Sequence, residues 1–305
     1  MVTLGLLILL FVAYQLWGTG IFTARAQERL KKQFNAEQAK DNPVVGPTTT
    51  TEHGKTSKST PTTRVIIPPP TILATPQEGQ VEGHIVIPKI NVDWYFVEGV
   101  QLEDIAKGPG HYPLTPLPGQ LGNSAIAGHR TTHGAPFYRV NELAAGDKIL
   151  ITTHKGLFTY AVTGQQIVQP TDFSVVQTTD PNVAELTLTS CNPRYSAAQR
   201  IVIHATLVPN ESAKPTKPAP VHLKRIGKGG TETLQQTLAS DLEGHTRPVT
   251  PTVLWGIIWA VVALAWWWLF RRWRHPASWI AGVMPFLLAL FVFYYYLERA
   301  LPPGI

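Results

Sequence analysis

The amino-acid sequence predicts an all-β fold, a closed barrel or a sandwich, joined to apolar segments long enough to span a membrane. Runs of apolar and β-branched residues recur at short intervals, and turns rich in glycine and proline separate them. Few stretches between these runs show helical periodicity. The expected strands are residues 85–87, 92–100, 124–127, 147–153, 157–163, 166–169, 186–189 and 201–203.

Two short helical segments complete the predicted β domain. Residues 102–106 read as a turn or a short helix, and residues 137–143 read as a short helix. The chain has 305 residues and one cysteine, so no disulfide can form within it. A domain of roughly 130 residues can be stabilised by its hydrophobic core alone, and we expect that here.

Three apolar segments are expected to form transmembrane helices, because each approaches the roughly 20 residues that a helix needs to cross a bilayer. The first comprises residues 2–22. An A-x-A-like site at residues 24–26 makes a cleaved signal peptide the alternative, but no basic region precedes the apolar run, which favours an uncleaved anchor. The other two, residues 253–270 and 278–297, are flanked by tryptophan and tyrosine clusters that suit membrane interfaces.

The positive-inside rule gives conflicting orientations for these segments. Arg271, Arg272 and Arg274 lie in the short connection between the last two segments and place that connection in the cytoplasm. Basic residues between positions 25 and 32 follow the first segment and would invert the protein. The short connection is the more sensitive to charge, so we predict a cytoplasmic N-terminus, with the β domain and the C-terminus outside.

Composition divides the rest of the chain into linkers. Residues 23–80 begin charged and helix-compatible and become rich in threonine and proline, which indicates a flexible stalk, and residues after 209 are again polar. The predicted organisation is a membrane anchor at 1–22, a stalk at 23–80, a catalytic domain at 81–208, a linker at 209–250, a two-helix transmembrane hairpin at 251–298 and a tail at 299–305.

The formal net charge of +6 does not indicate a nucleic-acid partner. Lysine and arginine residues are scattered, and no basic run alternates with aromatic residues as nucleic-acid-binding surfaces require. Membrane lipid or another anionic surface is the expected partner of this charge.

Cys191 is the first candidate for chemistry. It follows a strand-like run at residues 186–189, and the chain turns at Asn192 before a second apolar run begins after Arg200. A strand, a loop and a returning strand would place the thiol and the guanidinium at facing strand ends. The alternative is that a lone cysteine is a small buried hydrophobic residue.

His129 favours the catalytic interpretation of Cys191. It stands directly after Gly128 at the end of the expected strand 124–127. A nucleophilic cysteine needs a histidine that is close in space, although the two can be far apart in sequence. A histidine at a strand end is therefore a suitable partner.

Together, IAGHR at 126–130, LTLTSC at 186–191 and an arginine nine positions after the cysteine resemble the sortases. The resemblance covers residues 81–208 and includes the segments 83–100 and 108–130. It implies the closed eight-stranded β-barrel of that family, with short helices. Ser190 stands where the family usually has threonine, a change that retains a hydroxyl group.

The resemblance also implies a cysteine transpeptidase whose catalytic residues are His129, Cys191 and Arg200. Cys191 would attack the carbonyl carbon of a threonine and form a thioester, His129 would protonate the departing amine, and Arg200 would stabilise the oxyanion. Thr189, Ser190 and His133 are candidates for lining the substrate groove, whereas His111 is expected to be a loop histidine. No metal-ligand spacing or phosphate-binding loop is present, so we expect no cofactor and no metal.

Segments 110–123, 128–137 and 191–200 look most like class E sortases of high-GC Gram-positive bacteria, although His133 replaces a tyrosine that is usual there. That implies a membrane enzyme with an extracellular domain that acts on secreted proteins with LAxTG- or LPxTG-like C-terminal sorting signals and a cell-wall precursor amine. One alternative is a pilin-polymerising, class C-like sortase, whose members often carry a C-terminal membrane segment. Another is a membrane-tethered binding module that has lost the chemistry.

Overall fold

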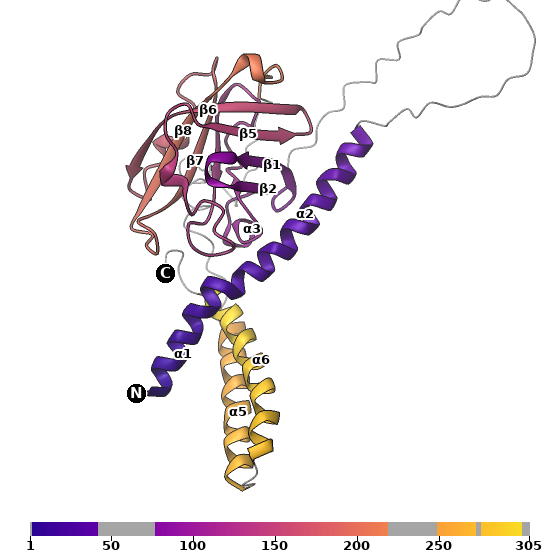
Figure 1. Ribbon diagram of the computed structural model, residues 1–305, viewed down its shortest axis with the longest axis vertical. Coiled ribbons are helices and arrows are strands. Elements are labelled where there is room, and N and C mark those ends of the chain that lie inside the picture. The colour runs from indigo at the N-terminus through magenta and orange to yellow at the C-terminus, as the bar shows by residue number, and fades with distance from the viewer. Residues whose placement is uncertain (1, 42–76, 219–248, 273–275, 301–305) are drawn as a thin grey trace, which may run out of the picture.

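The computed structural model describes residues 2–41, 77–218, 249–272 and 276–300, and its centre is a closed β-barrel (Figure 1). Neighbouring strands follow the order β1-β2-β3-β4-β7-β8-β6-β5, and β5 pairs with β1 to close the barrel. This confirms the predicted eight-stranded barrel. The strands are β1 (Val81–Ile87), β2 (Val92–Glu98), β3 (Gly110–His111), β4 (Gly122–Ala127), β5 (Lys148–Thr153), β6 (Gly156–Val168), β7 (Ala184–Asn192) and β8 (Gln199–Leu207).

Two strands differ from the prediction. β6 is one continuous strand where two were expected, because a β-bulge between Val162 and Gly164 lets it bend without ending. β3 was not predicted, since its two residues are too few to show alternation. It nevertheless connects β2 to β4 and so keeps the barrel closed.

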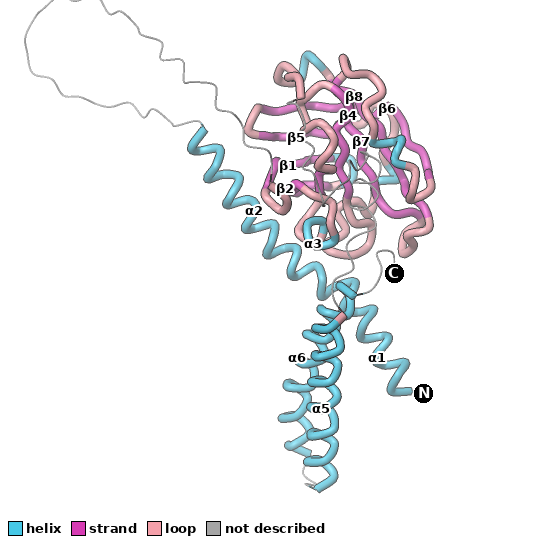
Figure 2. The backbone as a smooth tube through the Cα atoms, turned by 180° about the vertical axis from the view of Figure 1, so that it is seen from behind, coloured by secondary structure: helices cyan, strands magenta, loops and turns pink. Residues whose placement is uncertain are grey.

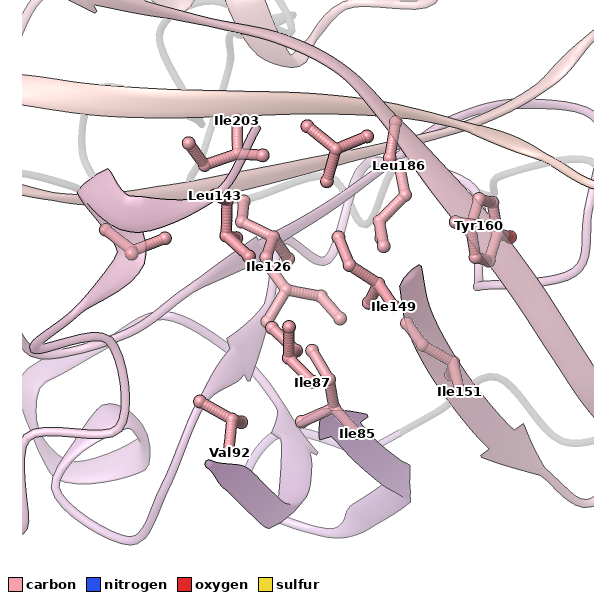
Figure 3. Packing of buried hydrophobic residues seen from close by; sticks show 14 of the residues in the cluster. Ile85, Ile87, Val92, Ile126, Leu143, Ile149, Ile151, Tyr160, Leu186 and Ile203 are labelled. Carbon is pink, nitrogen blue, oxygen red and sulfur yellow. The ribbon is translucent and has the colours of Figure 1, made fainter. Parts of the chain in front are cut away.

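The barrel interior is filled by branched aliphatic and aromatic side chains from almost every strand (Figure 3). The burial pattern of β1 alternates along the strand, as expected when one face lines a core. The most deeply buried side chains include Ile85, Ile87, Phe96, Ile126, Leu143, Ile149, Ile151, Phe158, Tyr160, Leu186, Leu188 and Ile203.

Short helical turns connect the strands (Figure 2). In place of the helix expected at 137–143 there is only a 3₁₀ turn, η3, and Phe137 before it is fully buried against Gly128. A Cβ atom at Gly128 would lie 2.5 Å from the Phe137 ring, so this close approach requires glycine. The turns are α3 (Leu102–Ile105), η2 (Pro88–Ile90), η3 (Val140–Glu142), η4 (Phe173–Val176) and η5 (Pro209–Glu211).

His111 is not the loop histidine that was expected. It lies on β3, is 1% exposed, and its Nδ1 is 2.7 Å from Glu98 Oε2. Its Nε2 faces the carbonyl oxygen of Pro116 at 3.0 Å, so both ring nitrogens face acceptors. Burial alone would lower the pKa of His111, but the Glu98 carboxylate and these hydrogen bonds raise it. The ion pair therefore links β2 and β3 inside the fold.

The helix that precedes the barrel is longer than predicted. α1 (Val2–Ala13), a π-helical turn (η1, Tyr14–Gly18) and α2 (Thr19–Asp41) form one continuous helical segment, and α2 lies alongside the barrel (Figure 1). Residues 23–41, expected to begin the stalk, are helical, and several of residues 23–40 are buried. The part of the stalk at 42–76 lies outside the described residues.

The chain after β8 also stays on the barrel for about ten residues beyond the predicted boundary at 209. Ala213 N donates to Leu157 O at 2.9 Å, and Thr216 N donates to Gly119 O at 3.0 Å. Residues 209–218 therefore extend the folded domain, and the expected linker at 219–248 lies outside the described residues.

α5 (Thr250–Arg272) and α6 (Pro276–Ala300) form an antiparallel pair that points away from the barrel (Figure 1). Among the residues that the structure describes, two helical segments are long and apolar enough to cross a membrane, Leu6–Lys40 and Thr250–Trp268. The prediction of three such helices is therefore supported only in part, since α6 contributes the shorter apolar stretch Val283–Leu297. Tyr294 in α6 donates a hydrogen bond from its hydroxyl to Leu7 O in α1 at 2.7 Å. The N-terminal end of α1 and the connected ends of α5 and α6 lie on the side away from the barrel (Figures 1 and 2).

Candidate active site

Cys191 lies near the end of β7, where strand pairing fixes its neighbours. β7 is antiparallel to β8, and the register places Cys191 directly opposite Arg200. The thiol is free and half-buried. The strand–loop–strand arrangement predicted from the sequence is confirmed, and it brings the thiol and the guanidinium to the same end of the barrel.

His129 reaches that end through the adjacent strand. β4 runs parallel to β7, and Ala127 pairs with Thr189. Beyond the last pair, Gly128 N donates to Thr189 O at 3.0 Å, and the Ser190 hydroxyl donates to Gly128 O at 2.7 Å. Because parallel strands place their carboxyl ends together, His129 leaves β4 beside the residues that immediately precede Cys191.

The His129 imidazole has one engaged nitrogen and one unengaged nitrogen. Nδ1 lies 3.2 Å from Thr132 Oγ1, whereas Nε2 is buried and has no hydrogen-bond partner among the described residues. Burial lowers the pKa of His129 to about 4, because the charged ring would lose its hydration. The ring is therefore neutral near pH 7, and a neutral Nε2 can accept a proton if Nδ1 carries the ring hydrogen.

His133 and Thr132 support this ring. The His133 ring stacks on the His129 ring with 4.5 Å between centroids and 24° between planes. The Thr132 hydroxyl lies 3.2 Å from Nδ1 of each histidine. A hydroxyl can accept from one nitrogen and donate to the other, so Thr132 can hold His129 in the tautomer that leaves Nε2 unprotonated.

Arg130 connects the histidine loop to the cysteine strand. It is 4% exposed, and its guanidinium donates to Cys191 O at 3.0 Å, to Tyr138 O at 2.9 Å and to Asn141 Oδ1 at 2.8 Å. Burial and the nearby Arg194 lower the pKa of Arg130. Its planar fork of donors fixes three backbone and side-chain acceptors at once, which makes it a positioning residue. This role was not predicted from the sequence, although Arg130 directly follows His129.

Arg200 is half-buried at the start of β8. Its Nη1 donates to the carbonyl oxygens of Ala197 at 2.9 Å and Gln199 at 3.1 Å. Its Nε and Nη2 make no hydrogen bond within the described part of the chain. One edge of the guanidinium is thus fixed by the loop before β8, and the remaining donors can serve a substrate.

Thr189 and Ser190, the predicted groove residues, are deeply buried at the end of β7. They are 5% and 4% exposed, and their hydroxyls are used inside the fold. The Thr189 hydroxyl lies 2.9 Å from the Tyr112 hydroxyl, while Ser190 binds Gly128 O as described above. Burial raises the pKa of Tyr112, and Arg200 opposes that rise, so Tyr112 lies under the site as a neutral phenol. These hydroxyls stabilise the strand ends.

Comparisons with known proteins agree with this geometry. The sortase domain family matches residues 85–208. Sortase D of Bacillus subtilis is 37% identical over 136 residues, which cover 44% of this chain and 67% of that protein. Sortase SrtE1 of Streptomyces coelicolor is 30% identical over 233 residues, which cover 71% of this chain and 58% of that protein.

Solved structures align with part of the chain. A sortase D5 transpeptidase from Clostridium perfringens has 25% identity and a TM-score of 0.44, and the alignment covers 61% of this chain and 97% of that chain. A sortase E from Streptomyces avermitilis has 32% identity and a TM-score of 0.40, and the alignment covers 43% of this chain and 90% of that chain. The sequence relatives and the matched domain show that this chain belongs to the sortase family of cysteine transpeptidases.

Proposed function

We propose that the protein is a membrane-anchored sortase that cleaves a C-terminal LAxTG- or LPxTG-like sorting signal between threonine and glycine. It then transfers the protein to a cell-wall precursor amine. The observation that carries the proposal is the strand register, which places Cys191 opposite Arg200 while the parallel pairing of β4 and β7 brings His129 to the same strand ends. The resemblance to class E sortases supports the choice of signal.

The proposed acylation step uses these three side chains. Cys191 Sγ attacks the threonine carbonyl carbon as the thiol proton moves to Nε2 of His129, and the unengaged donors of Arg200 bind the resulting oxyanion. The carbon–nitrogen bond to glycine then breaks, and His129 returns the proton to the departing amine. A thioester remains on Cys191.

The second half repeats the sequence with a different nucleophile. The amine of the acceptor attacks the thioester carbonyl and loses a proton to His129 as the carbon–sulfur bond breaks. His129 then protonates the departing thiolate, so the free enzyme is regenerated without a cofactor. The low pKa of His129 supports this order, because a neutral ring must take each proton before it can donate it.

Mass spectrometry of the purified full chain tests the proposed function directly. The chain in lipid nanodiscs is incubated with LAxTG or LPxTG peptides and no acceptor amine, and then digested under mildly acidic conditions. The expected product is the peptide acylated on Cys191 and cleaved after threonine. Intact peptides after prolonged incubation, with the protein still folded, would contradict the proposal.

Arg200→Lys should lower kcat by about a hundredfold, although the positive charge is kept. An ammonium group cannot donate to the loop carbonyls and to an oxyanion in the planar geometry of the guanidinium. Steady-state cleavage of a fluorescent sorting peptide measures the effect. Arg194→Lys is the matched control, because Arg194 lies in the loop between β7 and β8, over the Tyr138 ring, and should remain close to wild type. Equal kinetics for the two variants would reduce Arg200 to a general electrostatic role.

We also propose that residues 2–22 (α1, η1 and the first residues of α2), α5 and α6 all cross the membrane, with the barrel outside the cell. The N-terminal end of α1 and the connected ends of α5 and α6 lie on one side, opposite the barrel (Figure 1), which supports the orientation inferred from the arginine-rich connection.

Cysteine labelling tests this orientation. A Gly304→Cys substitution in a Cys191→Ala background should react with a membrane-impermeant maleimide on intact cells, because the C-terminus is expected outside. A cysteine introduced at Ala277, near the connected ends of α5 and α6, is the paired control and should react only after lysis. The reverse pattern in folded protein would overturn the orientation and the extracellular function with it.

A further inference from the structure

The helix that leaves the membrane docks on the barrel through one continuous face. Thr19, Thr23, Ala26, Leu30 and Phe34 are all buried, at spacings of three or four residues that place them along one side of α2. Leu30 and Phe34 pack against Val81, Val97 and Tyr95 of the barrel. α2 is therefore part of the folded domain, although it lies outside the region that the sortase domain family matches.

Polar contacts fix the register of this docked helix. Gln27 uses its whole amide: Nε2 donates to Tyr95 O at 2.8 Å and to Lys107 O at 2.9 Å, while Oε1 accepts from Tyr95 N at 2.8 Å. The Thr23 hydroxyl donates to Ala106 O at 2.8 Å. Buried hydrogen bonds with defined directions allow little rotation or sliding, so the position of α2 is defined along its length.

The first residue of α2 contacts the histidine loop itself. The hydroxyl of Thr19, which is 1% exposed, donates to Gln15 O at 2.7 Å and accepts from the backbone nitrogen of His133 at 3.1 Å. A Cβ atom at Gly20 would lie 3.9 Å from Gly134 N, so the helix backbone also approaches this loop.

The loop that Thr19 contacts has an unfavourable backbone conformation, which contacts with neighbouring residues must stabilise. His133, Gly134 and Ala135 have φ angles of 52°, 72° and 49°. Left-handed backbone is unfavourable for residues with a Cβ atom, and it persists where neighbouring contacts define it. The His133 ring stacks on His129, so a change in this loop would reach the His129 imidazole.

We propose that Thr19 is a positioning residue through which the membrane-exiting helix holds the His133 loop and, by the ring stack, the catalytic imidazole of His129. The role rests on the proposed transpeptidase function, in which His129 moves the protons. A helix from residue 2 to residue 22 spans about 30 Å, the thickness of a bilayer core, so Thr19 lies near the outer boundary of the membrane. Membrane anchoring and the geometry of the active site are thereby connected.

The test compares three variants of the full chain in lipid nanodiscs. Thr19→Val keeps the shape of the side chain but removes the hydroxyl, Thr19→Ser restores the hydroxyl, and Thr23→Val removes the buried hydroxyl one turn further along the same helix. We expect Thr19→Val to lower kcat about tenfold with little change in KM, which corresponds to the loss of one hydrogen bond in the chemical step. Thr19→Ser and Thr23→Val should remain within about twofold of wild type.

A second readout does not depend on activity. In protein labelled with ¹⁵N-histidine, the pKa of His129 can be measured by NMR titration. In Thr19→Val this pKa should rise from its low value toward about 6.5, because a loosened loop admits water to the ring. Wild-type titration and kinetics in Thr19→Val would overturn the proposal. Equal losses in Thr19→Val and Thr23→Val with matching falls in melting temperature would also overturn it, as a purely structural effect. An inactive wild type would refute the proposed function, and the titration would still decide the role of Thr19.

Discussion

Replacement of Cys191 by alanine should reduce cleavage of a sorting peptide by at least about a thousandfold, the scale on which the loss of a covalent nucleophile acts. No other described side chain at this end of the barrel can form the proposed thioester, and the chain has no second cysteine to replace it. The thiol is half-buried and makes no structural disulfide. The melting temperature should therefore stay close to that of wild type.

Peptide cleavage followed by mass spectrometry, with a melting curve on the same sample, measures both effects. Ser190→Ala is the control variant, because Ser190 precedes Cys191 but its hydroxyl binds Gly128 O inside the fold. It should lower stability by about 1 kcal/mol and leave most of the activity. A residual rate in Cys191→Ala above one part in about a thousand would exclude Cys191 as the nucleophile.

The sequence indicated that Cys191, Arg200 and His129 stand near strand ends, and the strand pairing agrees with those positions, while their catalytic roles stay predictions. Each lies at a strand end, and strand ends are marked in the sequence where an alternating run meets a glycine, an asparagine or a proline. The eight strands followed from the resemblance, because the residues by themselves left a barrel and a sandwich open. The division of β6 into two strands came from Gly164, which interrupts the pattern without ending the strand.

The groove residues could not be predicted in the same way. Thr189 and Ser190 precede the nucleophile, and alternation alone places one of them on each face of the strand. The structure buries both, because β7 is covered by Tyr112 on one side and by the His129 loop on the other. Burial of this kind depends on partners about 60 to 80 residues away in sequence (their separations are 77 and 62), which a local pattern does not contain.

The docking of α2 on the barrel was not predicted, for a different reason. Residues 23–41 are highly charged, and although they are helix-compatible, such a segment is typical of an exposed helix. The buried positions Ala26, Leu30 and Phe34 recur every four residues and form only a narrow apolar stripe. That spacing was a usable signal. The hydrogen bonds of Gln27 to the barrel backbone leave no signal in the sequence, since a glutamine that binds the barrel and an exposed glutamine look the same there.

His129→Ala should lower kcat/KM by about a thousandfold, within the range typical of a lost general base and acid. Both proposed half-reactions pass each proton through Nε2, which is buried and has no partner among the described residues. His133→Ala is the neighbouring control and should cost only about tenfold, because it removes a stacking partner rather than the proton acceptor. The opposite order of these losses would show that the catalytic histidine is His133.

The pH dependence of kcat/KM separates the role of His129 from a general structural effect, because this ratio reports the ionisation of the free enzyme. A base accepts a proton only when it is neutral, so activity should fall as the pH drops through the pKa of His129. Burial lowers that pKa to about 4. The acid limb of the wild-type profile should therefore lie near pH 4, well below the value of about 6.5 for a solvated histidine. It should be absent from the residual activity of His129→Ala. An acid limb at 6.5 in wild type would mean that the ring is hydrated in the working enzyme, and that the buried Nε2 is not its catalytic arrangement.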